Sequence, residues 1–159
     1  MSLSKLLIIG LVAVWSLQTT AATTTSPTKI TLSGVEKRTT MAQVPELWLD
    51  FEKANYLHST LKTTPQKVYV VYKAFSKDYQ QSDVYISYDV RDLTRYKHSK
   101  SIELTKFTQV LAQGIHTTKQ LSDAWKTFDY RKQVEAVLEI HTLASLGRKE
   151  QVELLVQYK

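Results

Sequence analysis

A carboxylate and an imidazole lie two residues apart in an apolar part of the chain. Glu139 belongs to the run AVLEI at residues 136–140, and His141 follows that run. Side chains two residues apart on a β-strand point to the same face, so this pair could carry out acid–base work. A buried, unpaired carboxylate costs on the order of several kcal/mol or stays protonated, and a cationic ligand would remove that cost. The alternative is that strand alternation turns Glu139 to solvent, with Leu138 and Ile140 inside.

Aromatic side chains could supply the walls of such a site, since a cation–π contact contributes about 0.5–2 kcal/mol. The candidates are Trp48 and Trp125 in helical windows and Tyr72 and Tyr85 in strand-like runs. Core packing is the alternative role for the tryptophans, and cross-strand surface pairing is the alternative for the tyrosines. The predicted ligand-binding set is Glu139, Trp48, Trp125, Tyr72, Tyr85 and His141. No residue is predicted to be catalytic in a pure binding protein.

Metal and cofactor chemistry has no support in the sequence. No two of the four histidines stand four apart on a predicted helix, and no carboxylate accompanies them at ligand spacing. The chain has no cysteine, which excludes disulfides, thiolate zinc sites and thiol nucleophiles. The motifs G-x-S-x-G, H-E-x-x-H and G-x-x-x-x-G-K are absent, so no metal and no cofactor are predicted.

Two similar helical windows must position these residues. Residues 40–51 (TMAQVPELWLDF) and 117–128 (TTKQLSDAWKTF) share Thr, Gln, Trp and Phe at an offset of 77 positions. Both place apolar residues at i, i+3, i+4 and i+7, which is one face of an amphipathic helix. Thr117 and Gln120 fit a capping box, whereas Pro45 favours a first helix that begins near Pro45.

Strand-like runs surround each helix, and their order predicts a duplicated unit. They cover residues 29–39, 68–75 and 84–90 in the first half, and 101–112, 136–142 and 152–158 in the second half. The predicted fold is α+β, a tandem β-α-β-β pair with pseudo-twofold symmetry. Its antiparallel sheet has helices packed on one side and a cleft between repeats. Repeat one is expected at about 29–91 and repeat two at about 101–159.

The N-terminal segment has the order of a secretory signal peptide. Lys5 is followed by the apolar run LLIIGLVAVWSL at residues 6–17 and by small residues up to Ala22. Cleavage is expected after Ala21 or Ala22, residues 23–28 form a linker, and the domain covers residues 29–159. A periplasmic or secreted protein without stable membrane insertion is expected. The alternative is an uncleaved anchor, although the run is short for a span of about 20 residues.

The chain carries a formal net charge of +6, and part of it lies in a basic stretch at residues 91–100. This stretch is expected to form a solvated connection between the repeats. Its basic residues are Arg91, Arg95, Lys97, His98 and Lys100. Contact with anionic lipid or polysaccharide is the alternative. Nucleic acid is not an expected partner, because the cluster lies in a loop of an exported chain.

The ordered set of segments resembles a known family. The helix VPELWLDF at residues 44–51 resembles the I-P-x-L-W-x-x-F helix of GyrI-like small-molecule-binding domains, also known as AraC-type effector-binding domains, which include free-standing integron-associated proteins. Six further segments are similar to later segments of that family, in the same order. They are residues 68–72, Tyr79, residues 84–85, residues 102–114, the Ala124–Trp125 pair and residues 138–140. The resemblance extends over residues 29–159.

This resemblance implies a cleft between two repeats that binds a small organic molecule. Many members bind lipophilic organic cations through a strand glutamate, which would be Glu139 here, and some relatives hydrolyse strained compounds with a glutamate and a tyrosine. The sequence departs from the family at His141, where a tyrosine is usual, and at Ser87, where glycine is frequent. It also lacks the DNA-binding domain that accompanies this fold in regulators.

The expected function is therefore an exported binding protein for an amphipathic organic ligand, including organic cations, with a small molecule as the partner. The first alternative is a small-molecule hydrolase that uses Glu139 as the base, assisted by a strand tyrosine or His141. The second is an envelope protein-interaction module that uses the basic loop. The ligand and the oligomeric state are left open.

Overall fold

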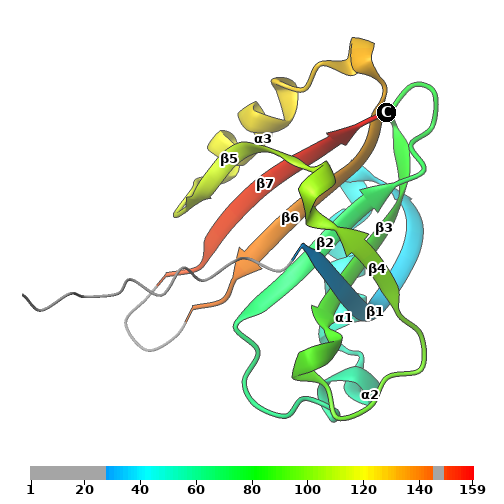
Figure 1. The fold of residues 1–159 in the computed structure, drawn as a ribbon, viewed down its shortest axis with the longest axis vertical. Coiled ribbons are helices and arrows are strands. Elements are labelled where there is room, and N and C mark those ends of the chain that lie inside the picture. Colours follow the sequence, from blue (N-terminus) through cyan, green and yellow to red (C-terminus); the bar gives the residue numbers. More distant parts are fainter. Residues whose placement is uncertain (1–27, 145–148) are drawn as a thin grey trace, which may run out of the picture.

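A curled, seven-stranded antiparallel sheet forms the body of the protein, which confirms the predicted α+β class (Figure 1). The structure is a computed structural model that describes residues 28–144 and 149–159. The predicted signal peptide and most of the linker lie outside the described residues. In the order β4-β1-β3-β2-β6-β7-β5, the strands are β4 (Lys100–Glu103), β1 (Lys29–Thr40), β3 (Gln81–Asp89), β2 (Lys67–Lys73), β6 (Val134–Thr142), β7 (Gln151–Tyr158) and β5 (Thr108–Gly114).

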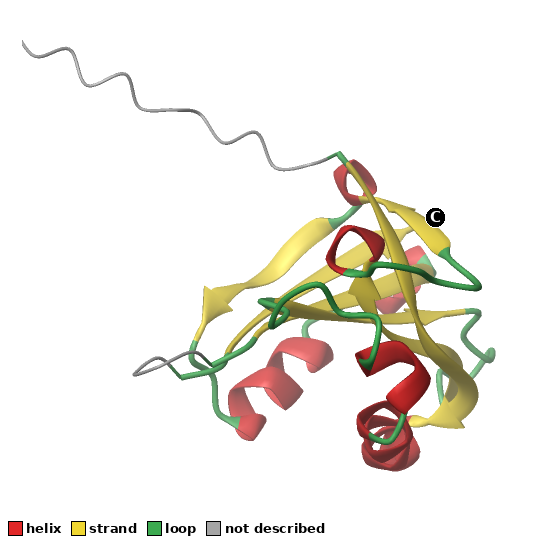
Figure 2. Cartoon of the chain, turned by 90° about the horizontal axis from the view of Figure 1, so that it is seen from below, coloured by secondary structure: helices red, strands yellow, loops and turns green. Residues whose placement is uncertain are grey.

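Both predicted helices form, and they lie on the same face of the sheet (Figure 2). Helix α1 (Val44–Glu52) has Pro45 in its first turn, where proline lacks only an N–H that would be unpaired anyway. Helix α3 (Thr118–Lys126) begins with the predicted capping box. In it the Gln120 N–H donates to Thr117 Oγ1 and the Thr117 N–H donates to Gln120 Oε1. A third short helix, α2 (Asn55–His58), follows α1.

Short 3-10 turns complete the described secondary structure, at Met41–Gln43, Val90–Asp92, Leu104–Lys106 and Tyr130–Lys132. No helix among the described residues is both long enough and apolar enough to cross a membrane.

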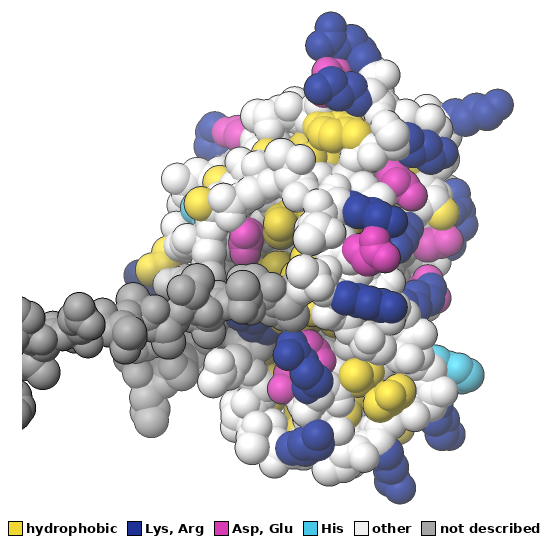
Figure 3. All heavy atoms as spheres, viewed as in Figure 1, with side chains coloured by type: hydrophobic (Ala, Val, Ile, Leu, Met, Phe, Trp, Pro, Cys, Tyr) yellow, Lys and Arg dark blue, Asp and Glu magenta, His cyan; other side chains and the backbone are white. Residues whose placement is uncertain are grey.

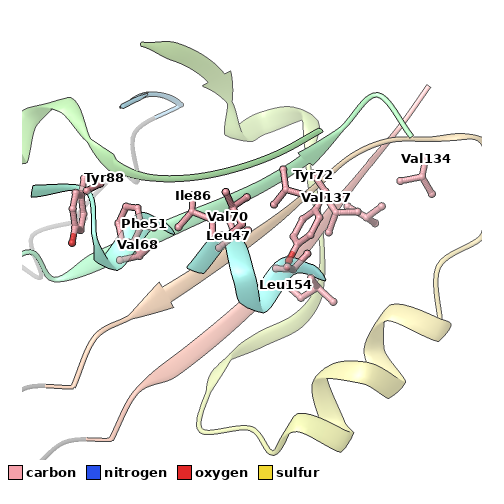
Figure 4. Close-up of a cluster of buried hydrophobic side chains, with 14 of the residues drawn as sticks. Leu47, Phe51, Val68, Val70, Tyr72, Ile86, Tyr88, Val134, Val137 and Leu154 are labelled. Carbon is pink, nitrogen blue, oxygen red and sulfur yellow. The ribbon is translucent and has the colours of Figure 1, made fainter. Parts of the chain in front are cut away.

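Apolar side chains are buried on both faces of the sheet. The face that carries the helices packs Leu47 and Phe51 of α1 against Val70, Tyr72 and other strand residues (Figure 4). The opposite face has a core of its own, made by Ile30, Leu32, Tyr69, Val71, Tyr85, Ile102, Leu138 and Ile140. A strand inside this sheet can therefore bury consecutive residues, because neither face is left to solvent.

The predicted single strand at residues 101–112 is wrong. The structure divides it into β4, which pairs with β1, and β5, which pairs with β7. These two strands are the opposite edges of the sheet. The 3-10 turn Leu104–Lys106 separates them, and Leu104 and Phe107 pack against the core on the face away from the helices. The connection thus crosses the sheet from one edge to the other.

The two halves of the chain meet along β2 and β6. The first half contributes the order β1-β3-β2 and the second half the order β6-β7-β5. At the junction β2 and β6 are antiparallel, with Val70 opposite Glu139 and Tyr72 opposite Val137. Helix α1 contacts β1 and β3, whereas α3 contacts β5. The central pair of strands therefore runs between the two helices.

Candidate functional site

Glu139 is buried on the helix-covered face of β6, with 5% of its surface exposed. Along β6, Val137 faces the helices, while Leu138 and Ile140 belong to the core on the opposite face. Glu139 and His141 share the face of Val137, because side chains alternate along a strand. The structure thus places Glu139 inside and also buries Leu138 and Ile140. The alternative, in which Glu139 points to solvent, required one face of the sheet to be exposed. At β6 both faces of the sheet are covered.

Each oxygen of the Glu139 carboxylate has a side-chain partner. The Trp125 indole Nε1–H donates to Oε1 at 2.9 Å, and His141 Nε2 lies 3.1 Å from Oε2. The other ring nitrogen of His141, Nδ1, lies 2.8 Å from Glu150 Oε1. A neutral imidazole has only one N–H, so hydrogen bonds to two carboxylates require the protonated ring. His141 therefore occupies the position of a cation beside Glu139.

The protonation of His141 follows from its surroundings. Burial by itself lowers the pKa of this imidazole, but its hydrogen bonds and charge interactions with Glu139 and Glu150 outweigh burial. The net result is that the pKa of His141 is raised above its ordinary value. The side chains of Glu139 and His141 are nearly inaccessible, so their attraction is weakly screened by solvent.

Tyr72 and Trp125 line the site from β2 and α3. Their rings meet edge to face, with centroids 4.9 Å apart. Burial, followed by the negative charge of Glu139, raises the pKa of Tyr72 well above its ordinary value. Tyr72 therefore remains a neutral phenol in the folded protein, with a proton available for a hydrogen bond.

Trp48 reaches the site from α1. Its ring lies edge to face with the His141 imidazole, with centroids 5.2 Å apart, and also contacts Phe51. The structure therefore brings together five of the six predicted ligand-binding residues around the β2–β6 junction. They are Glu139, His141, Trp48, Trp125 and Tyr72.

Tyr85 is the exception, and the structure does not bring it to this cluster. It lies on the opposite face of the sheet, where its hydroxyl donates to the Leu32 carbonyl at 3.1 Å. Lys100 lies 5.3 Å from the centre of its ring. The reason is alternation along β3, which turns Val84 and Ile86 towards the helices and Tyr85 away from them.

Glu150 is the residue of this cluster that sequence reasoning missed. It lies just before β7, and the antiparallel pairing of His141 with Val152 brings the start of β7 beside the end of β6. The sequence could have indicated Glu150 if the two strand-like runs at β6 and β7 had been paired as a hairpin, because that pairing brings the start of β7 next to His141. Its carboxylate fixes His141 from the side opposite to Glu139.

The space between the helices is largely filled by side chains of the protein itself. A cavity of about 60 Å³ adjoins Trp125, and the other residues that line it are Met41, Phe75, Tyr79, Phe128, Tyr130, Val134 and Val137. Trp125 lines this cavity and also holds Glu139 Oε1. The indole thus contacts both the cavity and the carboxylate, and Glu139 itself is not among the residues that line the cavity.

The arrangement can hold a positive charge, and it can also relay a proton between carboxylates. Within residues 28–144 and 149–159, no three metal-ligating side chains gather at a common point. Comparison with known proteins gives no family assignment, since no protein-family model and no curated protein matches the chain.

Proposed function

We propose that the protein binds a small amphipathic organic molecule, with organic cations preferred, at the junction of β2 and β6 between α1 and α3. The observation that carries this proposal is the buried pair of the Glu139 carboxylate and the protonated His141. Trp125 of α3 and Tyr72 of β2 neighbour the carboxylate, and Trp48 of α1 packs against the imidazole. A buried carboxylate needs a positive partner. His141 supplies that partner in the present arrangement, and a cationic ligand would take over the role.

Ligand entry requires Trp125 to move. The indole donates one hydrogen bond to Glu139 and lines the cavity of about 60 Å³, while the rings of Tyr72 and Phe128 pack against it. Rotation would release Oε1 and add the space now filled by the ring to the cavity. Tyr72 and Trp48 would then form the walls against which a cation packs.

The strand order supports membership in the GyrI-like type of fold that the sequence resembles. Apart from β4 and the short helix α2, each half of the chain contributes three strands and a helix. The strand orders are β1-β3-β2 and β5-β7-β6, and the halves join at equivalent strands, β2 and β6. Trp48 and Trp125 occupy matching positions in the two similar sequence windows, residues 40–51 and 117–128. We propose that the domain is a tandem β-α-β-β pair with pseudo-twofold symmetry. Export to the periplasm or beyond is part of the proposal, on the basis of residues 1–22.

The test is a titration followed by tryptophan fluorescence. In a Trp15→Phe variant of the full chain, only Trp48 and Trp125 remain to report. The probes are tetraphenylphosphonium, its isosteric anion tetraphenylborate, and neutral triphenylphosphine oxide. Saturable quenching by the cation that is lost in Glu139→Gln supports the proposal. Equal binding of all three probes contradicts the charge role of Glu139, and no saturable change with any probe contradicts the function.

A small-molecule hydrolase is the second candidate, because His141 bridges two carboxylates at 3.1 and 2.8 Å. Such a chain can move a proton between Glu139 and Glu150 during a reaction. The two candidates differ in the effect of Glu150→Gln. If the protein is a hydrolase, Glu150→Gln changes the pH profile of turnover. If it is a binding protein, neither the wild type nor Glu150→Gln turns over activated esters or epoxides.

A further inference from the structure

A cavity of about 680 Å³ lies between β1, α2 and the loop that joins β3 to β4, and Glu139 is not among the residues that line it. This volume is in the range of small-molecule sites. Its floor is made by buried side chains, including Ser33, Leu57 and Thr60. Its rim is made by Tyr56 from α2 and by Arg95, Tyr96, Lys97 and His98 from the loop.

The structure divides the basic stretch at residues 91–100 into two groups. Arg91 forms a bidentate pair with Asp89, and Lys100 pairs with Glu36. Arg95, Lys97 and His98 are the members that line the cavity, and none of them forms an ion pair with any residue that the structure describes. No acidic side chain lines this cavity. The rim is thus a concentration of uncompensated positive charge.

Two tyrosines add aromatic surface to the same rim. Tyr56 is 64% exposed and Tyr96 is 51% exposed, so neither ring is used in the core. In Figure 3, basic side chains surround exposed hydrophobic side chains in the lower part of the view, which is the end of the molecule that holds α2 in Figure 1. Exposed aromatic rings beside arginine and lysine can hold a ligand that has both a flat ring and a negative charge.

The two walls of the cavity are fastened to each other. The Thr94 N–H donates to the Thr60 carbonyl at 2.6 Å, and the Lys62 N–H donates to the Asp92 carbonyl at 2.9 Å. Between these bonds Leu61 pairs with Leu93, which is buried. The loop therefore has a fixed base next to α2, and the side chains of its rim are presented from a defined backbone.

We infer that this cavity is a second binding site, which takes a small aromatic anion such as an aryl phosphate or aryl carboxylate. The acid group contacts Arg95, Lys97 and His98, and the ring packs against Tyr56 or Tyr96. Arginine suits planar anions because its guanidinium donates two parallel hydrogen bonds. The site does not use Glu139, so it is independent of the function proposed above.

The test follows backbone amide shifts of the full chain by NMR while phenyl phosphate is added, with phenol and inorganic phosphate as matched probes. Saturable shifts at residues 56–60 and 94–98 are expected. The double variant Arg95→Ala/Lys97→Ala should weaken phenyl phosphate binding by about tenfold or more, since it removes charged hydrogen-bond donors. The matched control Lys37→Ala/Lys77→Ala removes the same charge from exposed lysines outside this cavity and should change binding by less than about twofold.

A second pair of variants tests the aromatic part. Tyr56→Leu/Tyr96→Leu should weaken phenyl phosphate binding but not inorganic phosphate binding. The inference is overturned if phenyl phosphate causes no saturable shifts at these residues, or if the control lysines matter as much as Arg95 and Lys97. It is also overturned if only a polyanion such as a heparin fragment binds, because the surface would then be a polymer contact.

Discussion

Trp125 of α3 donates its indole N–H to the buried Glu139 carboxylate of β6 at 2.9 Å, and the same indole lines the small cavity beside it. The indole therefore contacts both the carboxylate and the cavity, and it shares the hydrogen bonding of the carboxylate with His141.

Trp125→Phe removes the hydrogen-bond donor to Glu139 Oε1 and keeps most of the aromatic volume. The free energy of unfolding should fall by about 1–3 kcal/mol, because a buried carboxylate oxygen loses its partner. Urea unfolding at neutral pH measures this. The matched control is Trp48→Phe, since Trp48 contacts His141 through its ring, and its cost should stay below about 1 kcal/mol. Equal losses in the two variants would show that the Trp125 hydrogen bond contributes no stability.

The stability of the protein should depend on the ionisation of His141. The pKa of His141 is raised in the folded state above its ordinary 6.5. Its stabilising contribution is therefore complete below pH 6.5 and is lost as the pH rises through the folded-state pKa. Unfolding measured at a series of pH values should show this decline, and His141→Gln should abolish it. A Glu150→Gln variant should retain a smaller decline, because Glu139 still faces the imidazole. An unchanged profile in His141→Gln would rule out this origin.

Gly34 should not tolerate a side chain. A Cβ at this position of β1 would lie 1.9 Å from the Ile86 carbonyl oxygen and 2.5 Å from Ser87 Cα, so the backbone of β3 would have to move. Gly34→Ala is expected to destabilise the protein by about 2–4 kcal/mol in thermal or urea unfolding. Gly114→Ala is the matched control, because its nearest neighbour is the His116 side chain at 3.1 Å, which can shift. Similar costs for both glycines would contradict the close approach of β1 and β3.

Burial should keep the Tyr72 phenol neutral at high pH. Burial is the main cause that raises the pKa of Tyr69 and of Tyr85 to about 12, and it raises the pKa of Tyr72 well above the ordinary 10.0. At a pH between 10.0 and 12, while circular dichroism shows a folded chain, Tyr72→Phe should leave the ultraviolet signal of phenolate unchanged. A loss of signal in Tyr72→Phe would mean that Tyr72 ionises in the folded protein.

Much of the local structure could be predicted because its causes are local. The spacing of Leu47 and Phe51 indicated the buried face of α1, and the Thr117–Gln120 capping box marked the start of α3. The two-residue spacing of Glu139 and His141 was sufficient to place them on one face of a strand. Each of these inferences uses only the period of a helix or strand, which neighbouring residues determine.

The parts that could not be predicted depend on which strands become neighbours. Residues 101–112 carry apolar residues throughout, but the division into β4 and β5 depends on two partners, β1 and β7, at opposite edges of the sheet. Tyr85 and Tyr72 were equivalent in the sequence, and only the pairing of β2 with β3 and β6 decided which of them faces Glu139. The contact of Glu150 with His141 likewise depends on the register of β6 and β7.

The sequence by itself determined the class of the fold, the two amphipathic helices and the shared face of Glu139 and His141, because helix and strand periods act over a few residues. Only the tertiary structure decided that both faces of β6 are covered, that His141 is the charge partner of Glu139, and that Arg95, Lys97 and His98 stand without acidic partners among the described residues. The physical reason is that burial and charge pairing depend on side chains that are distant in the chain and become neighbours only when the sheet is assembled.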